Sequence, residues 1–162
     1  MYRIGQGWDR HRLEPGRRCV LGGVTFPECP VGPLGHSDGD ALCHALADAL
    51  LGAAGLGDLG RHFPDTDPRW RDADSLDLLA RVRGLVNQAG LVVENVDATV
   101  ITEQPMIAPA AAAIRERLAA ALGISASQVS VKGTRGEGLG PEGRGECVTV
   151  QAVALLRREA SS

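Results

Sequence analysis

The segment Cys147-Val-Thr-Val-Gln-Ala-Val-Ala-Leu-Leu156 has the composition of a β-strand, and it decides how the sheet of this protein is covered. Successive side chains of a strand point to opposite faces of the sheet. Val148 and Val150 fall on one face of this segment, and Val153 and Leu155 fall on the other. A strand that is apolar on both faces is buried on both faces. We therefore expect helices on one face of the sheet and another copy of the chain on the other.

The rest of the chain mixes helical and strand patterns without strict alternation. Apolar residues recur at helical spacing in three segments, Asp38 to Gly55, Ser75 to Gln88 and Pro109 to Leu122. Strands are predicted at Tyr2 to Trp8, Asn95 to Thr102 and Val129 to Lys132, and a hairpin at Cys19 to Phe26. Ser37 and Asp40 have the spacing of a helix capping box. This mixture favours an α+β fold with helices packed on one face of a sheet.

Length and charge limit the classes of function. A chain of 162 residues is typical of one domain, which we place at residues 1–157, with a disordered tail at residues 158–162. A net charge of −3 without a basic run argues against nucleic acid and anionic membranes as partners. No apolar run approaches the length of about 18 residues that a membrane span needs. The first residues lack a signal-peptide pattern, so we expect a cytoplasmic protein.

Asp9 and His11 follow the first predicted strand, and residues two apart in extended chain point the same way. His44, near the start of a predicted helix, is a candidate third metal ligand. Asp40 and Asp48 each lie four residues from His44, so either acid can orient its second ring nitrogen. Two nitrogens and one carboxylate leave one position of a tetrahedral zinc ion free, which is typical of catalytic zinc. The alternative is a solvated Asp–His hydrogen bond and a helix histidine paired with an acid.

Further polar groups suggest phosphate chemistry. Acidic residues cluster around the same segment, namely Asp38, Asp40, Asp58, Asp65 and Asp67. Hard cations such as Mg²⁺ bind such oxygens together with substrate phosphates, although these residues also cap helices and turns. The loop from Lys132 to Gly140 either offers cations and backbone amides to phosphate oxygens or is an ordinary solvated loop. The residues alone indicate metal-assisted phosphate chemistry and go no further.

A series of short motifs occurs in an order and spacing that identify one enzyme family. The motifs are Gly5-x-Gly7-x-Asp9-x-His11, Leu21-Gly22-Gly23-Val24, His36-Ser37-Asp38-Gly39-Asp40, His44-Ala45, Asp48-Ala49-Leu50-Leu51-Gly52-Ala53, Gly57-Asp58-Leu59-Gly60, Phe63-Pro64-Asp65-Thr66-Asp67-Pro68 and Gly143-Arg144-Gly145-Glu146. With these motifs the chain resembles, over nearly its whole length, the 2-C-methyl-D-erythritol 2,4-cyclodiphosphate synthases of the non-mevalonate isoprenoid pathway.

The resemblance implies a cyclisation of 4-diphosphocytidyl-2-C-methyl-D-erythritol 2-phosphate. The 2-phosphate attacks the β-phosphorus, and CMP leaves. The resemblance also implies a homotrimer whose sheets face a threefold axis and whose active sites lie between neighbouring subunits. An isoprenoid diphosphate is a further expected ligand, in a cavity on that axis.

Roles for individual residues follow from the same resemblance. Asp9, His11 and His44 match the ligands of one Zn²⁺, or a similar divalent ion, per subunit. His36 and Ser37 match residues beside the attacking phosphate, where an imidazole offsets developing charge.

The resemblance also assigns the second metal and the substrate loops. Glu137 matches the carboxylate that holds a second ion, Mg²⁺ or Mn²⁺, between the substrate phosphates. The loop around the methylerythritol and the ribose matches Asp58, Leu59, Gly60, Phe63, Pro64, Asp65, Thr66 and Asp67. The cytidine pocket of the neighbouring subunit matches Thr102, Pro105, Met106, Ile107, Ala108 and Thr134.

The chain departs from the family pattern at two positions. Arg135 stands where the family has a hydroxyl that stabilises the transition state, and we carry this catalytic role to its guanidinium. Met106 stands where the family has a lysine near the nucleotide. Trp8 and Arg144 match the residues that line the axial cavity, although a packed tryptophan and a salt-bridged arginine explain them equally well.

Two other functions compete with the cyclase. The same three ligands suit a zinc-dependent phosphohydrolase, in which bound water replaces the internal phosphate as nucleophile. A trimeric module that binds nucleotide or isoprenoid diphosphate without turnover is the third possibility. Cyclic product with stoichiometric CMP distinguishes the cyclase from both.

Overall fold

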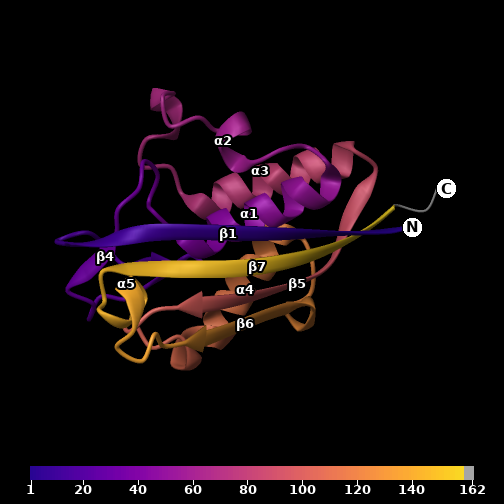
Figure 1. Ribbon diagram of the computed structural model, residues 1–162. Coiled ribbons are helices and arrows are strands. Elements are labelled where there is room, and N and C mark those ends of the chain that lie inside the picture. Colours follow the sequence, from indigo (N-terminus) through magenta and orange to yellow (C-terminus); the bar gives the residue numbers. More distant parts are fainter. Residues whose placement is uncertain (159–162) are drawn as a thin grey trace.

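A curled five-stranded sheet runs the length of the molecule in the computed structural model, which describes residues 1–158 (Figure 1). In spatial order its strands are β4 (Val31–Pro33), β1 (Tyr2–Pro15), β7 (Cys147–Arg158), β5 (Leu91–Ile101) and β6 (Val129–Thr134). Strands β5 and β6 are parallel, and the other pairs are antiparallel. The predicted hairpin is confirmed as β2 (Val20–Leu21) and β3 (Val24–Thr25).

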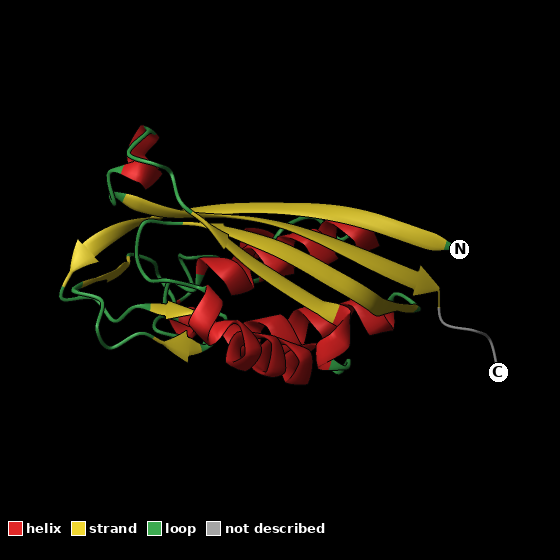
Figure 2. Ribbon diagram, turned by 90° about the horizontal axis from the view of Figure 1, so that it is seen from below, coloured by secondary structure: helices red, strands yellow, loops and turns green. Residues whose placement is uncertain are grey.

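Three helices cover one face of the sheet, namely α1 (Ala41–Ala54), α3 (Ser75–Gln88) and α4 (Ala111–Leu122). Figure 2 shows them as one layer beneath the strands. The remaining helical pieces are short: α2 (Leu59–His62), α5 (Gly140–Gly143), η1 (Pro68–Trp70), η2 (Ala108–Ala110) and η3 (Ala126–Gln128). The predicted α+β fold is confirmed. No helix within residues 1–158 is long and apolar enough to cross a membrane.

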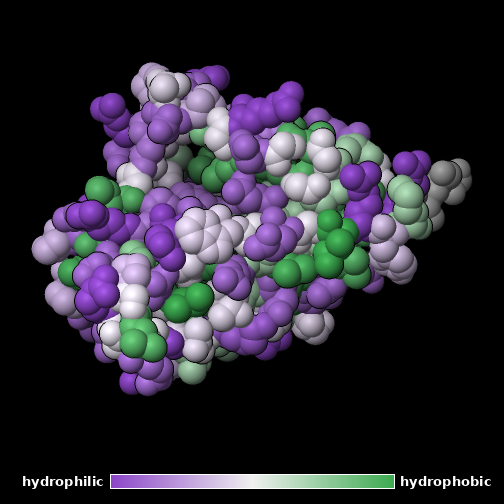
Figure 3. Space-filling view, viewed as in Figure 1, coloured by the Kyte–Doolittle hydropathy of each residue, from purple (hydrophilic) through white to green (hydrophobic). Residues whose placement is uncertain are grey.

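The strand predicted at Cys147 to Leu156 is confirmed as β7, and the structure places it between β1 and β5. On its helix side the side chains are almost fully buried, from Val148 to Leu156 in alternate positions. On the opposite side Val153 is 40% exposed, and the neighbouring strand β1 exposes Ile4 and Trp8 to 73% and 48%. Figure 3 looks onto this open face and shows its hydrophobic groups. Coverage of this face by another copy of the chain stays a prediction.

Two glycines of β1 bring α1 unusually close to the sheet. A Cβ atom at Gly7 would overlap the carbonyl oxygen of Ala45, and one at Gly5 would overlap that of Ala49. The small residues on both elements therefore set the distance between strand and helix. This close packing places His44 of α1 beside the carboxyl-terminal half of β1.

The first helix begins at Ala41, with Asp40 as its N-cap, so the capping box predicted from Ser37 is wrong. The Asp40 carboxylate accepts hydrogen bonds from the N–H groups of Leu42 and Cys43. It also accepts the N–H groups of the hairpin glycines at 2.9 and 2.7 Å. Asp40 is only 1% exposed, and burial raises the pKa of its carboxyl although the hydrogen bonds from these donors lower it. The carboxylate thus joins the β2–β3 turn to α1.

Element boundaries differ from prediction mainly at strand ends. Strand β1 continues seven residues beyond Trp8 because its second half pairs with β4 and with the start of β7. Helix α3 has the predicted bounds. Strand β7 extends to Arg158, where the predicted tail begins, and the rest of that tail, residues 159–162, lies outside the described residues.

Candidate functional site

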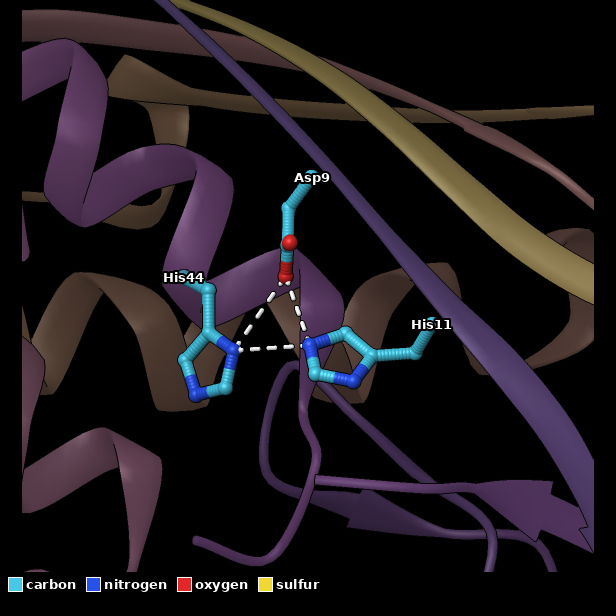
Figure 4. A group of neighbouring side chains, drawn as sticks. All are labelled: Asp9, His11 and His44. Atoms are coloured by element: carbon cyan, nitrogen blue, oxygen red, sulfur yellow. Dashed lines mark hydrogen bonds and ion pairs between the residues drawn. The ribbon is translucent and has the colours of Figure 1, made fainter. Parts of the chain in front are cut away.

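Three metal-ligating atoms meet between β1 and α1. Strand alternation turns Asp9 and His11 toward the helix layer, and His44 comes from the first turn of α1. Asp9 Oδ2 lies 2.9 Å from His11 Nε2 and 3.2 Å from His44 Nδ1, and the two nitrogens are 3.1 Å apart. Figure 4 shows the carboxylate of Asp9 pointing between the two imidazole rings. Among the described residues, this is the one group of three or more potential metal ligands that converges in this way.

The geometry fits a tetrahedral metal ion. Nitrogen and oxygen ligands about 2.0–2.1 Å from such an ion lie roughly 3.3 Å from one another. The measured separations are close to this value. The ring of His11 is also turned correctly, because its Nδ1 faces the carbonyl oxygen of Leu34, which only accepts hydrogen bonds. The proton of a neutral His11 therefore lies on Nδ1, and Nε2 offers its lone pair to the shared position.

The charge of Asp9 changes the titration of this group. Burial by itself lowers the pKa of the His11 imidazole, but the hydrogen bond and charge of Asp9 outweigh burial and raise that pKa above its ordinary value of 6.5. Burial raises the pKa of the Asp9 carboxyl, yet hydrogen bonds from His11 and His44 hold it far below its ordinary value of 3.8. A metal ion must therefore displace a proton that His11 holds more tightly than a free histidine does.

We expect the apparent metal affinity to fall as the pH drops through the raised pKa of His11, by about tenfold per pH unit for one displaced proton. Metal-free protein is expected to show the opposite trend. A raised folded-state pKa stabilises the fold below 6.5, and this stabilisation is lost as the pH rises through the folded-state pKa. Zinc titrations and thermal unfolding across a pH series measure both trends. A constant zinc affinity between about pH 8 and about pH 6 would contradict the ligand role of His11.

The second ring nitrogen of His44 does not contact Asp40 or Asp48, so that prediction is wrong. Nε2 of His44 lies 3.0 Å from the hydroxyl oxygens of both Ser37 and Ser75. Asp40 is engaged by four backbone N–H groups. Asp48 instead accepts the backbone N–H of Leu59 at 2.7 Å and so fixes the start of α2.

A cavity of about 330 Å³ opens beside the three ligands. Of the residues predicted to bind substrate or to act in catalysis, the structure brings five to its wall: His36, Ser37, Leu59, Phe63 and Asp65. The others from the same loops do not line the cavity. Asp58 caps α2 through the N–H of Arg61, and Asp67 forms an ion pair with Arg69 at 2.6 Å. His36 donates from Nε2 to the backbone carbonyl of Asp67 at 3.3 Å.

Two wall residues, Trp70 and Leu78, were not predicted as part of the site. Asp48 was predicted only as a partner of the His44 ring, and it lines the cavity instead. Trp70 packs edge-on against Phe63 with ring centroids 5.0 Å apart, and no periodic pattern marks that contact.

A second, smaller pocket of about 140 Å³ lies at the ends of β5 and β6. Its lining contains all the residues predicted for the nucleotide, together with Gly133 and Arg135: Thr102, Pro105, Met106, Ile107, Ala108 and Thr134. The guanidinium of Arg135 lies against the sulfur of Met106, with Nη2 and Sδ 3.1 Å apart. The two cavities share no lining residue.

The remaining predicted residues lie outside both cavities. Glu137 is an exposed residue with a φ of +54° in the loop after β6. Arg144 forms an ion pair with Glu146 at 2.7 Å. Trp8 is not packed in the core, and the guanidinium of Arg10 lies 5.0 Å from its ring centroid.

Known proteins share both the sequence and the fold of this chain. Residues 2–157 match the model of the YgbB family. The chain is 57% identical over 154 residues to the 2-C-methyl-D-erythritol 2,4-cyclodiphosphate synthase of Moorella thermoacetica, which covers 95% of this chain and 94% of that protein. The bifunctional IspDF from Campylobacter jejuni matches 98% of this chain with a TM-score of 0.93 at 35% identity, but this chain spans only 42% of it. The CDP complex of IspF from Plasmodium falciparum has a TM-score of 0.86 at 34% identity, covering 98% and 97% of the two chains.

Proposed function

This chain belongs to the YgbB family, and from that premise we propose how its residues carry out the family's reaction. The protein is an enzyme that converts 4-diphosphocytidyl-2-C-methyl-D-erythritol 2-phosphate to 2-C-methyl-D-erythritol 2,4-cyclodiphosphate and CMP. The phosphohydrolase alternative is not supported, because the relatives of high identity are cyclodiphosphate synthases.

The convergence of Asp9, His11 and His44 on one cavity is the observation that carries this proposal. These residues hold one Zn²⁺ or a similar divalent ion, and the ion, when bound, polarises the β-phosphate that is attacked. Because the nucleophile and the leaving group belong to one molecule, catalysis consists mainly of alignment and charge neutralisation.

The chain's own residues provide the alignment. His36 lies on the cavity wall, where its imidazole offsets charge on the attacking 2-phosphate. Ser37, the next residue, also lies on the cavity wall and is placed beside the attacking 2-phosphate. The methylerythritol is held by the walls from residues 58–60 and 63–67, which the hydrogen bond between Asp48 and Leu59 keeps against α1.

The nucleotide end of the substrate binds to a neighbouring copy of the chain in a homotrimer. The metal ligands on β1 and the second pocket at β6 are separated by two strands, or about 14 Å at ordinary strand spacing. One chain therefore carries two separate half-sites. The exposed apolar side chains of the open sheet face provide a surface through which three copies associate.

In the neighbouring half-site Arg135 offsets charge on the phosphates in place of the family hydroxyl. Its guanidinium lies on the rim of the second pocket, where it can reach phosphate oxygens with two donors. We assign Trp8 and Arg144 to a site for an isoprenoid diphosphate at the proposed threefold axis. The cytoplasmic location stays a prediction.

Glu137 would hold the second divalent ion, Mg²⁺ or Mn²⁺, which would neutralise charge on the substrate phosphates. We expect Glu137→Gln to keep one zinc per chain and to raise the Mg²⁺ concentration needed for half-maximal CMP release by about tenfold, because an amide is a weaker ligand for hard cations. Zinc content and a Mg²⁺ titration of activity measure the two effects separately.

The matched control for this experiment is Glu116→Gln, an exposed glutamate on α4. This variant is expected to titrate with Mg²⁺ like the unaltered enzyme. If Glu137→Gln also gives an unchanged Mg²⁺ titration, the second-ion role of Glu137 is wrong.

A further inference from the structure

Two residues outside the cavity, Ser75 and Asp38, form a chain of hydrogen bonds that ends at His44 Nε2, the ring nitrogen away from Asp9 and His11. Ser75, the first residue of α3, is 1% exposed, and its hydroxyl oxygen lies 3.0 Å from His44 Nε2. The same hydroxyl donates to the Asp38 carboxylate. Asp38 also accepts the backbone N–H of Ser75 at 3.1 Å through its other oxygen. Neither Asp38 nor Ser75 lines the cavity.

Counting protons fixes the direction of these hydrogen bonds. A carboxylate only accepts, so the single hydroxyl proton of Ser75 is committed to Asp38. Toward His44 the oxygen of Ser75 can then only accept a hydrogen bond. When a metal ion occupies the site, the single proton of the neutral His44 ring therefore belongs on Nε2, and Nδ1 offers its lone pair to the position that it shares with Asp9 and His11.

We propose that Asp38 and Ser75 are positioning residues that keep His44 in the form in which Nδ1 binds the metal. This inference rests on the metal site of the proposed function and adds the pair that orients its third ligand. Asp38 also accepts the backbone N–H of Asp40 at 3.1 Å, just before α1 begins. One carboxylate thus ties the helix that carries His44 to the residue that orients its ring.

Ser37 touches the same nitrogen but lacks this directionality. Its hydroxyl oxygen lies 3.0 Å from His44 Nε2 and accepts the N–H of Gly39 at 3.4 Å, so its own proton is not committed to a carboxylate. By itself the hydroxyl of Ser37 could either donate to His44 Nε2 or accept from it, so Ser37 does not fix the position of the ring proton. It therefore serves as an internal control, because it has the same chemistry and distance but no carboxylate behind it.

The test is the zinc affinity of metal-stripped protein, measured by competition with a chromophoric chelator. We expect Ser75→Ala and Asp38→Asn each to weaken zinc binding by about 10–100-fold. Because the two residues act as one unit, the double variant is expected to lose no more zinc affinity than the single variant with the larger loss. Ser37→Ala is expected to stay within about threefold of the unaltered protein. Thermal unfolding of each metal-free variant shows whether it is folded.

A second readout follows the proton itself. In zinc-loaded protein the Nε2 proton of His44 is expected to give a slowly exchanging NMR signal, because the hydroxyl oxygen of Ser75 accepts it. In Ser75→Ala this signal is expected to exchange faster, whereas Ser37→Ala leaves it slow.

Three results would overturn the inference. They are zinc affinities of folded Ser75→Ala within twofold of the unaltered protein (about 0.4 kcal/mol), losses that multiply in the double variant, and an equal loss in Ser37→Ala. If the unaltered protein itself fails to bind zinc, it is the proposed metal site that is wrong, and the two failures are thereby distinguished.

Discussion

His44→Ala is expected to abolish both metal binding and turnover. In the proposed metal site His44 is one of the three ligands found within residues 1–158, and its loss leaves Asp9 and His11 on one strand with no ligand from α1. Without a bound ion the β-phosphate is not polarised, and turnover is expected to fall by about 10³-fold or more. Zinc content after dialysis and the rate of CMP release measure the two losses.

The control for this variant is His62→Ala. His62 is a half-buried histidine whose Nε2 donates to the Leu56 carbonyl at 2.9 Å, and it does not line the cavity. This variant is expected to keep one zinc per chain. If His44→Ala keeps stoichiometric zinc and full activity, His44 is not a metal ligand.

Mixing two inactive variants is expected to restore activity. His44→Ala destroys the metal half-site, and Ala108→Trp fills the pocket of about 140 Å³ at the ends of β5 and β6. If each active site combines half-sites from two neighbouring chains, random co-assembly of equal amounts leaves about a quarter of the sites with both halves intact. The CMP release of the co-refolded mixture measures this fraction.

Two controls define this complementation experiment. Each variant refolded alone is expected to stay inactive, and so is a mixture of the two variants that were assembled separately and do not exchange subunits. If the co-refolded mixture is also inactive although mass spectrometry finds mixed oligomers, both halves of the site come from one chain.

The pairing of Asp9 with His11 was predictable because strand alternation alone puts residues two apart on one face. Their contact with His44 does not follow from spacing. It depends on Gly5 and Gly7, which let α1 approach β1, and in the sequence only the family motifs indicate it. Local spacing was misleading for Asp40, whose carboxylate is fully engaged by backbone N–H groups.

Contacts between distant segments explain what sequence patterns missed. Ser75 was placed correctly as a helix start, but its contact with His44 joins residues 31 positions apart. The second pocket depends on the parallel pairing of β5 and β6, which sets Thr134 opposite Ile101 and beside Thr102. Neither the helix-to-helix approach nor the parallel register is encoded in any local period.

Phosphorus NMR tests the central claim most directly. Metal-loaded protein is incubated with 4-diphosphocytidyl-2-C-methyl-D-erythritol 2-phosphate and Mg²⁺, beside a control stripped of metal with EDTA. We predict a cyclic diphosphate and an equimolar amount of CMP, both lost in the control. Linear hydrolysis products, or CMP binding without any reaction, would contradict the account.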